Sequence, residues 1–232
     1  MKHAALTLVT IIAGLLVLAA LCLVFLCSPV DANMGIVQKI FYFHVSSAYT
    51  MYLSWGVVTV CSIVFLARRS ERADMLARSA AELTLVFTVI VLVTGPLWGR
   101  KSWGAYWSWD PRLTSTLLFA TIVASYALLR GLSSGEAERR FAAALSILGA
   151  CVAPIIHISV QKWRGQHPTV ITGKGGGLAP EMWPPFIVSL AAFTLLFAAL
   201  LWHRYRLEEN RRRIADLAER IAARGLGEED AP

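Results

Sequence analysis

The sequence predicts an all-α integral membrane protein with six transmembrane helices and both termini in the cytoplasm. Three observations lead to this prediction. Of the 232 residues, 56% are hydrophobic and only 16% are charged, whereas a soluble domain carries about 25% charged residues. Six apolar segments are long enough to cross a bilayer, and arginines gather in alternate connections between them. The net charge of +7 therefore reflects membrane topology, and the pattern does not favour nucleic acid as a partner.

Each apolar segment approaches or exceeds the roughly 20 residues that cross about 30 Å of hydrocarbon as a helix. The fourth segment is the shortest, and the first is too long for a typical signal peptide. The predicted spans cover residues 4–27, 37–66, 75–97, 113–129, 141–160 and 185–202.

Basic residues favour the cytoplasmic side of a membrane protein, so the arginine-rich connections set the orientation. Arginines follow the second, fourth and sixth spans. An even number of spans then keeps both termini inside. The connections expected to face outward are residues 28–36, 98–112 and 161–184.

Two parts of the chain follow from this topology: a six-helix membrane domain over residues 1–205, and a cytoplasmic tail over residues 206–232. The tail has apolar side chains at helical spacing among alternating acidic and basic ones, namely Leu207, Ile214, Leu217 and Ile221. We expect an amphipathic helix that lies on the membrane lipid or docks a partner, and periodicity alone favours neither.

The four cysteines lie inside apolar segments, and the sequence has neither a C-x-x-C pair nor a C-x-x-C-H haem attachment site. We expect them to behave as small buried hydrophobes.

The most unusual stretch is the outward segment 98–114, W-G-R-K-S-W-G-A-Y-W-S-W-D-P-R-L-T. Tryptophan and tyrosine often anchor helix ends at the membrane surface. Such belts, however, supply one or two aromatics per helix end. The density here favours a flat binding platform built from the aromatic side chains of Trp98, Trp103, Tyr106, Trp107 and Trp109.

Three histidines fall near the same membrane surface. The run 37–66 would extend about 45 Å as a helix, longer than the hydrocarbon core, so His44 is expected at the outer boundary. His157 lies near the outer end of the fifth span, and His167 lies in the third outward loop. These positions bring His44 and His167 close to the aromatic segment.

The outward loops also keep basic residues that a topology rule prefers inside. They are Arg100, Lys101, Arg112, Lys162, Arg164 and Lys174. Binding of an anionic group explains their position, with lipid headgroups as the alternative. Asp110 and Pro111 open the fourth span, and this pair is typical of a helix N-terminus, so we expect Asp110 to be an N-cap that also orients the site.

Two imidazoles, a flat aromatic field and several cations suit haem. Neutral imidazole is a good ligand for haem iron, aromatic rings cover a porphyrin, and arginine pairs with carboxylates such as propionates. No thiolate or carboxylate set suited to zinc accompanies the histidines.

Three motifs carry a resemblance to a known family. W-G-A-Y-W-S-W-D-P-R-L-T-S resembles the tryptophan-rich "WWD" signature of haem-handling membrane proteins, F-Y-F-H-V-S-S-A resembles their first histidine motif, and P-I-I-H-I-S-V-Q-x-W-x-x-x-H resembles the second. Their order, with six spans, is most similar to the cytochrome c maturation protein C (CcmC) family.

The resemblance implies a site and a set of partners. His44 and His167 match the two axial ligands of haem b, carried transiently as cargo, with Trp98 to Trp109 cradling it on the periplasmic face of the bacterial inner membrane. The propionates are expected near Arg100, Arg112 or Arg164. The family presents haem to the chaperone CcmE, with CcmD, CcmA and CcmB as further partners. No ATP-binding signature occurs in the chain, so any use of ATP belongs to partners.

Three departures from the family pattern stand out: Tyr106 replaces a common tryptophan, Lys162 precedes Trp163 where an aromatic pair often occurs, and Pro168 follows His167. Tyr106 and Trp163 still leave a stacking surface. Two alternatives stay open. A CcsA-type cytochrome c synthetase shares the tryptophan-rich motif but usually has more spans, and a structural membrane subunit would bind no haem.

Overall fold

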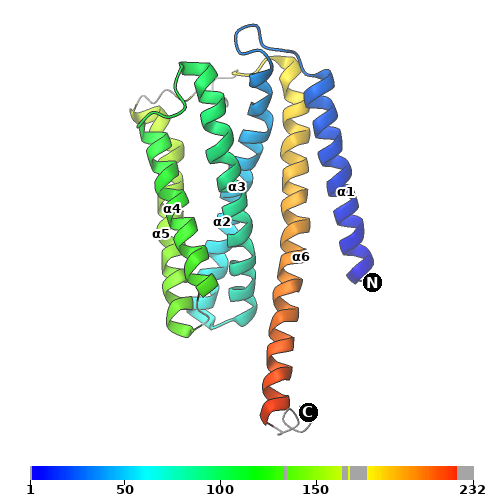
Figure 1. Cartoon of the computed structure of the whole chain (residues 1–232), viewed down its shortest axis with the longest axis vertical. Coiled ribbons are helices and arrows are strands. Elements are labelled where there is room, and N and C mark those ends of the chain that lie inside the picture. The colour runs from blue at the N-terminus through cyan, green and yellow to red at the C-terminus, as the bar shows by residue number, and fades with distance from the viewer. Residues whose placement is uncertain (1, 133–134, 164–166, 168–176, 224–232) are drawn as a thin grey trace, which may run out of the picture.

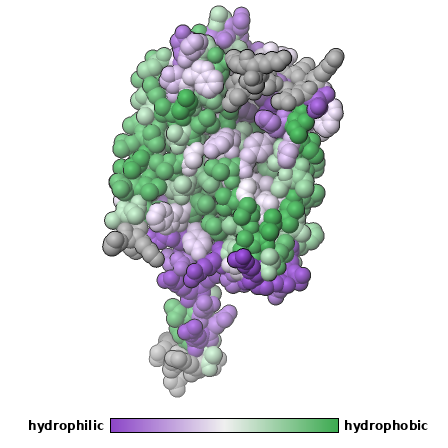
Figure 2. Space-filling view, turned by 180° about the vertical axis from the view of Figure 1, so that it is seen from behind, coloured by the Kyte–Doolittle hydropathy of each residue, from purple (hydrophilic) through white to green (hydrophobic). Residues whose placement is uncertain are grey.

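The computed structural model describes residues 2–132, 135–163, 167 and 177–223. Six helices in this part of the chain are long and apolar enough to cross a membrane. The predicted number of spans is therefore confirmed. On the face shown in Figure 2, hydrophobic residues cover the middle of the molecule and hydrophilic ones gather towards its ends, as expected for a bilayer-spanning protein.

Four of the helices, α3 to α6, are longer than the predicted apolar spans because polar residues extend them. The main helices are α1 (Lys2–Cys22), α2 (Ile40–Arg68), α3 (Glu71–Trp103), α4 (Pro111–Leu132), α5 (Glu136–Trp163) and α6 (Trp183–Ala223). Short turns adjoin three of them: a π-helical turn at Leu23–Cys27 and 3-10 turns at Ile36–Lys39 and Pro180–Met182.

The helices form one bundle with an outlying helix (Figure 1). Helix α2 contacts α3, α5 and α6, while α4 packs against α3 and α5. Helix α1 lies along α6 at the side of the bundle. We call the end where α3 finishes and α4 begins the tryptophan-rich end, and the end with the α2–α3 turn the arginine-rich end.

Trp55 holds three helices together near the middle of the bundle. Its ring meets Phe119 and Tyr126 of α4 edge-to-face, at centroid distances of 5.4 and 5.8 Å. Its indole N–H donates to the Ser146 carbonyl of α5 at 3.2 Å. Close packing and such hydrogen bonds stabilise helix association inside lipid, where the hydrophobic effect between helices is weak.

A buried ion cluster joins four helices at the arginine-rich end. Asp74 of α3 is 3% exposed and lies 2.8 Å from Arg130 of α4 and 3.0 Å from Arg212 of α6. Arg139 of α5 lies 3.6 Å from the same carboxylate. One acidic side chain therefore links α3 to α4, α5 and α6.

The sixth helix extends well beyond the others at this end (Figure 1). It continues without a break through the predicted tail as far as Ala223. A further ion pair, Arg78 with Glu208 at 2.9 Å, ties its lower part to α3. The apolar side chains predicted to form one face of the tail are between 47% and 67% exposed: Leu207, Ile214, Leu217 and Ile221.

At the other end, α3 enters the segment that was expected to be a loop. The helix includes Pro96 and runs on to Trp103, so Trp98 and Trp103 are helical residues. Gly104 ends the helix with a positive φ of 84°. The irregular segment is thus shorter than predicted, and only residues 104–110 separate α3 from α4.

Candidate functional site

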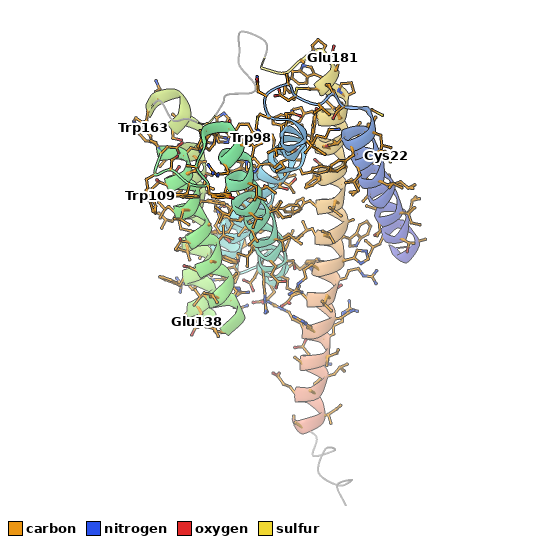
Figure 3. All side chains as sticks on the ribbon, turned by 45° about the horizontal axis from the view of Figure 1, so that its top comes forward. Cys22, Trp98, Trp109, Glu138, Trp163 and Glu181 are labelled. Atoms are coloured by element: carbon orange, nitrogen blue, oxygen red, sulfur yellow. The ribbon has the colours of Figure 1, made fainter. Side chains whose placement is uncertain are left out.

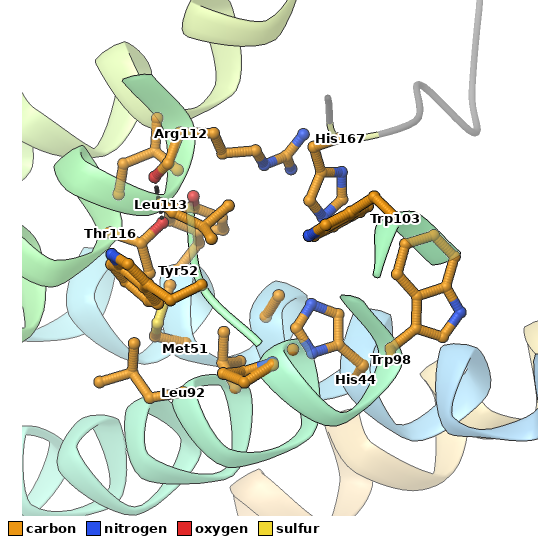
Figure 4. Close-up of a pocket in the computed structure, with 16 residues that line it drawn as sticks. His44, Met51, Tyr52, Leu92, Trp98, Trp103, Arg112, Leu113, Thr116 and His167 are labelled. Atoms are coloured by element: carbon orange, nitrogen blue, oxygen red, sulfur yellow. Dashed lines mark hydrogen bonds between the residues drawn. The ribbon is translucent and has the colours of Figure 1, made fainter. Parts of the chain in front are cut away.

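A pocket opens at the tryptophan-rich end between α2, α3, α4 and α5 (Figure 4). Its volume is about 70 Å³. Most of its walls are apolar, and they come from segments far apart in the sequence. The lining residues used below are His44, Tyr52, Gly95, Trp98, Trp103, Trp107, Arg112 and His167. Thr94 does not line the pocket but contacts His44 from behind the wall.

His44 lies in the second turn of α2 and faces α3. Its Nδ1 atom is 2.9 Å from the hydroxyl oxygen of Thr94. Gly95 brings the α3 backbone close to the imidazole, because a Cβ atom at this position would lie 3.2 Å from His44 Cε1. The ring is therefore held on a helix rather than on a loop.

His167 lies across the pocket from His44. The two ring centroids are 6.4 Å apart, and the ring planes make an angle of 31°. Trp98 stacks against His167 at a centroid distance of 6.3 Å. Figure 4 shows the two imidazoles opposite one another, with Trp98 and Trp103 beside them. The structure thus brings together the two histidines that the sequence singled out.

The five aromatic residues of segment 98–109 separate into two groups. Trp98, Trp103 and Trp107 line the pocket, and the first two meet edge-to-face at 5.4 Å. Tyr106 and Trp109 are 58% and 76% exposed and do not line it. In Figure 3, Trp98 lies over the middle of the bundle and Trp109 lies at its edge.

The three tryptophans in the wall also carry unpaired polar groups. The indole nitrogens of Trp98, Trp103 and Trp107 are buried and have no hydrogen-bond partner among the described residues. Buried donors in folded proteins are nearly always paired. A bound molecule with acceptor oxygens at the pocket would satisfy them.

The charged residues of the same segment divide in a similar way. Arg112 lines the pocket, and among the described lining residues it is the one arginine, with no lysine, aspartate or glutamate beside it. Arg100 is exposed and lies away from the pocket, where it donates to the Gly104 carbonyl and stacks over Tyr106 at 5.7 Å. The pocket therefore combines a cation with imidazoles and N–H donors, which suits an anionic ligand.

Asp110 acts as the N-cap of α4, as predicted. Its Oδ1 atom accepts a hydrogen bond from the backbone N–H of Leu113 at 2.8 Å. This cap fixes the first turn of α4, from which Arg112 reaches the pocket. The residue therefore orients the site through the backbone.

One of the two remaining predicted residues lies elsewhere. Trp163 ends α5, is 59% exposed and does not line the pocket; Figure 3 shows it at the edge of the bundle. Arg164 lies outside the described residues.

Sequence reasoning missed Tyr52 and Thr94. Tyr52 follows His44 by eight residues and Thr94 precedes Trp98 by four, so each shares a helix face with a residue that was recognised. Helical spacing counted from the histidine and tryptophan motifs would have found both.

The comparisons with known proteins identify the family of the chain. The sequence profile of the family described as CcmC, "Heme exporter protein C", matches residues 1–220. The chain is 39% identical to "Heme exporter protein C" of Bradyrhizobium diazoefficiens over 200 residues, which is 85% of this chain and 76% of the relative.

Proteins of the same description occur in other bacteria. The Rhodobacter capsulatus protein is 34% identical over 84% of this chain and 83% of its own length. The Escherichia coli K12 protein is 33% identical over 77% of this chain and 73% of its own length. With a profile match that extends over nearly the whole sequence, the chain belongs to the heme exporter protein C (CcmC) family.

Proposed function

We propose that this protein binds haem between His44 and His167 and presents it to the haem chaperone CcmE. Family membership implies haem handling for cytochrome c maturation in a bacterial membrane. Six membrane-spanning helices fit a multi-pass protein of this kind. To this family-level role we add three proposals: which residues bind the iron, which chaperone receives the haem, and on which side of the membrane the site lies.

The observation that carries the proposal is the spacing of the two imidazoles. An imidazole nitrogen binds a first-row metal at about 2.0–2.1 Å and lies about 1.1 Å from its ring centre, so two imidazoles on opposite sides of one metal have ring centres roughly 6.3 Å apart. The centroids of His44 and His167 are 6.4 Å apart. This separation leaves room for one iron atom between them and supports axial ligation of haem b as a transient cargo.

The rest of the wall matches the other parts of a haem. Trp98, Trp103 and Trp107 offer apolar ring surface, and their unpaired indole N–H groups can donate to propionate oxygens. Arg112 supplies the positive charge that a propionate needs. We assign the exposed side chains to the rim over which haem is handed on: Arg100, Tyr106, Trp109 and Trp163. Arg164 stays a proposed partner of a propionate on the basis of the sequence.

The pocket has to open when haem binds. Ligand sites for molecules of this size have volumes of about 300–1,000 Å³, whereas the closed pocket holds about 70 Å³. His44 is held by α2 and α3. We therefore propose that the wall formed by Trp103 and Trp107 moves outward during loading and again during transfer.

The orientation follows from the distribution of arginines. The α2–α3 turn and the C-terminal half of α6 lie at the opposite end of the bundle from the junction of α3 and α4 (Figure 1). The first of these ends carries the ion cluster and the arginines of α6, and the second carries the pocket. Basic residues favour the cytoplasm, so we propose that the pocket faces the periplasm. CcmA, CcmB and CcmD are the proposed membrane and cytoplasmic partners, and ATP use belongs to them.

Transfer to CcmE requires the release of one axial ligand. A histidine of the chaperone can displace His167, while His44 remains on its helix. The protein then acts by holding and releasing haem rather than through a conventional catalytic site.

The test begins with absorption spectra of the purified protein after haem is supplied, recorded with the haem oxidised and then reduced. The haem-loaded protein is then mixed with apo-CcmE. We expect a low-spin, six-coordinate spectrum and then covalent labelling of CcmE. No haem binding under these conditions would return the tryptophans to a membrane-anchoring role. Binding without transfer would overturn only the proposed recipient.

Gly99→Ala is expected to weaken haem binding. A Cβ atom at this position would lie 2.6 Å from Trp103 Cζ2, so the indole that forms the wall must move. Overpacking costs about 1–3 kcal/mol, equivalent to roughly a five- to hundredfold weaker affinity if the strain falls on the bound state. Haem titration measures the change. Gly14→Ala is the control, because a Cβ atom there meets nothing within 4 Å; equal affinities for both variants would contradict the prediction.

A further inference from the structure

Thr94 makes two hydrogen bonds that together determine how His44 is protonated. Its hydroxyl donates to the Ile90 carbonyl, one turn earlier in α3, with an oxygen-to-oxygen distance of 2.6 Å. The same hydroxyl oxygen lies 2.9 Å from His44 Nδ1. A hydroxyl has one proton to donate. Since the hydroxyl proton is donated to the carbonyl, the Thr94 oxygen must accept a hydrogen bond from the N–H at Nδ1.

The neutral imidazole then carries its proton on Nδ1 and its lone pair on Nε2. We propose that Thr94 is a positioning residue that selects this form of His44 and so prepares Nε2 to bind haem iron. The inference rests on the proposed function, in which His44 is an axial ligand. Nothing in the sequence motifs that identified His44 and His167 assigns a role to Thr94.

Packing restricts the ring as well as its protonation. Thr94 holds Nδ1, and the backbone of the next residue, Gly95, adjoins the Cε1 atom between the two nitrogens; a Cβ atom there would lie 3.2 Å away. The imidazole therefore has little freedom to turn about its Cβ–Cγ bond. Nδ1 points to α3, which leaves the opposite edge, with Nε2, towards His167 across the pocket (Figure 4).

A hydrogen bond from the second ring nitrogen has two effects on a metal-binding imidazole. It fixes the tautomer and orientation, and it raises the basicity of the nitrogen that binds the metal. In His44 this second partner is a helix side chain, Thr94, which itself bonds the Ile90 carbonyl. The hydrogen bond therefore prepares His44 Nε2 to bind iron.

The chain offers a closely matched control for this role. Thr88 is a buried threonine of the same helix, and its hydroxyl also bonds the carbonyl four residues earlier, at 2.7 Å to Thr84. Thr88→Val therefore removes the same intrahelical bond without touching the pocket. Thr94→Val removes the acceptor for Nδ1 while preserving the shape of the side chain. Thr94→Ser restores the hydroxyl.

The experiment measures haem affinity and haem reduction potential of the full-length protein and of these three variants. Loss of a partner to a ligating histidine typically weakens metal binding about 10- to 100-fold. We expect a loss of that size in Thr94→Val together with a raised reduction potential, because a less basic ligand stabilises the oxidised iron less. Thr94→Ser and Thr88→Val are expected to resemble the wild type.

A second readout needs no haem. Nitrogen-15 NMR of histidine-labelled apoprotein reports which ring nitrogen of His44 is protonated, with His44→Ala identifying the signal. We expect the proton on Nδ1 in the wild type and a mixture of tautomers in Thr94→Val. Wild-type haem binding with an unchanged affinity, potential and tautomer in Thr94→Val would overturn the role of Thr94 alone. Failure of the wild type to bind haem would overturn the proposed function. The NMR spectra would then still show whether Thr94 determines which nitrogen of His44 is protonated.

Discussion

Replacing His44 with alanine, or His167 with alanine, is expected to remove the low-spin haem spectrum. Each change takes away one of the two nitrogen ligands that lie on opposite sides of the proposed iron position. Since loss of an outer hydrogen-bond partner alone costs about 10- to 100-fold in affinity, loss of a ligand should cost at least about a hundredfold. Haem titration and absorption spectra of oxidised and reduced protein measure both the affinity and the spin state.

The two variants are not expected to be identical. His44 is held on α2 by its contacts with α3, so His167→Ala should retain weak five-coordinate haem more readily than His44→Ala. Free imidazole added to either variant should enter the space left by the missing side chain and restore a six-coordinate spectrum.

His157→Ala provides the control, because His157 is exposed on α5 and lines a groove separate from the pocket. We expect it to bind haem as the wild type does. A wild-type spectrum in either ligand variant, or an equal loss in His157→Ala, would contradict the bis-histidine site.

Asp74→Ala is expected to destabilise the bundle more than any other single change at the arginine-rich end. Asp74 is buried and faces three arginines on three different helices. Arg130 is itself 5% exposed, and its Nε and Nη1 atoms are buried without a hydrogen-bond partner in the described residues. Removing the carboxylate would leave a buried guanidinium without its counter-ion. Breaking a buried ion pair in this way costs about 3–5 kcal/mol.

The measurement is the free energy of unfolding in mixed micelles titrated with denaturing detergent. The control is Glu209→Ala, which removes an exposed pair between Glu209 and Arg213 at 3.0 Å. Exposed pairs contribute about 0–1 kcal/mol, so this variant should be close to the wild type. Equal stabilities of the two variants would show that the Asp74 cluster does not hold the helices together.

These two predictions concern opposite ends of the molecule, and they separate function from folding. The histidine variants should lose haem while unfolding at nearly the same detergent concentration as the wild type. Asp74→Ala should lose stability even without haem. A single variant that lost both haem binding and stability would indicate that the pocket forms only when the arginine-rich end of the bundle is intact.

Much of the fold was predictable because the bilayer imposes a local requirement. Each span needs about 20 apolar residues and internal hydrogen bonds, whatever the rest of the chain does. The six spans and the Asp110 cap were therefore visible in the sequence. Helix ends were harder to predict, because polar residues outside the hydrocarbon layer can continue a helix without the free-energy penalty of entering the lipid. Helix α3 accordingly runs through Pro96 to Trp103.

The site was predictable in its composition but not in its geometry. The sequence singled out His44, His167 and a field of aromatic residues, which suffices to suggest haem. It did not separate Trp98, Trp103 and Trp107, which line the pocket, from the exposed aromatics around them. Trp98 and Trp103 lie on the part of α3 that was expected to be a loop, so their helical face was not predicted. In the irregular residues 104–110, the direction of a side chain depends on what it packs against, which no sequence periodicity indicates.

The sequence by itself determined the membrane spans and the kinds of side chain gathered near the tryptophan-rich end, since both depend on residues close together in the chain. Tertiary structure alone decided that His44 and His167 stand 6.4 Å apart and that Arg112 rather than Arg100 lines the space between the helices. It also placed Thr94 against His44. These relations arise where the ends of four helices converge, because the packing of α2 to α5 sets distances between residues that no local pattern connects.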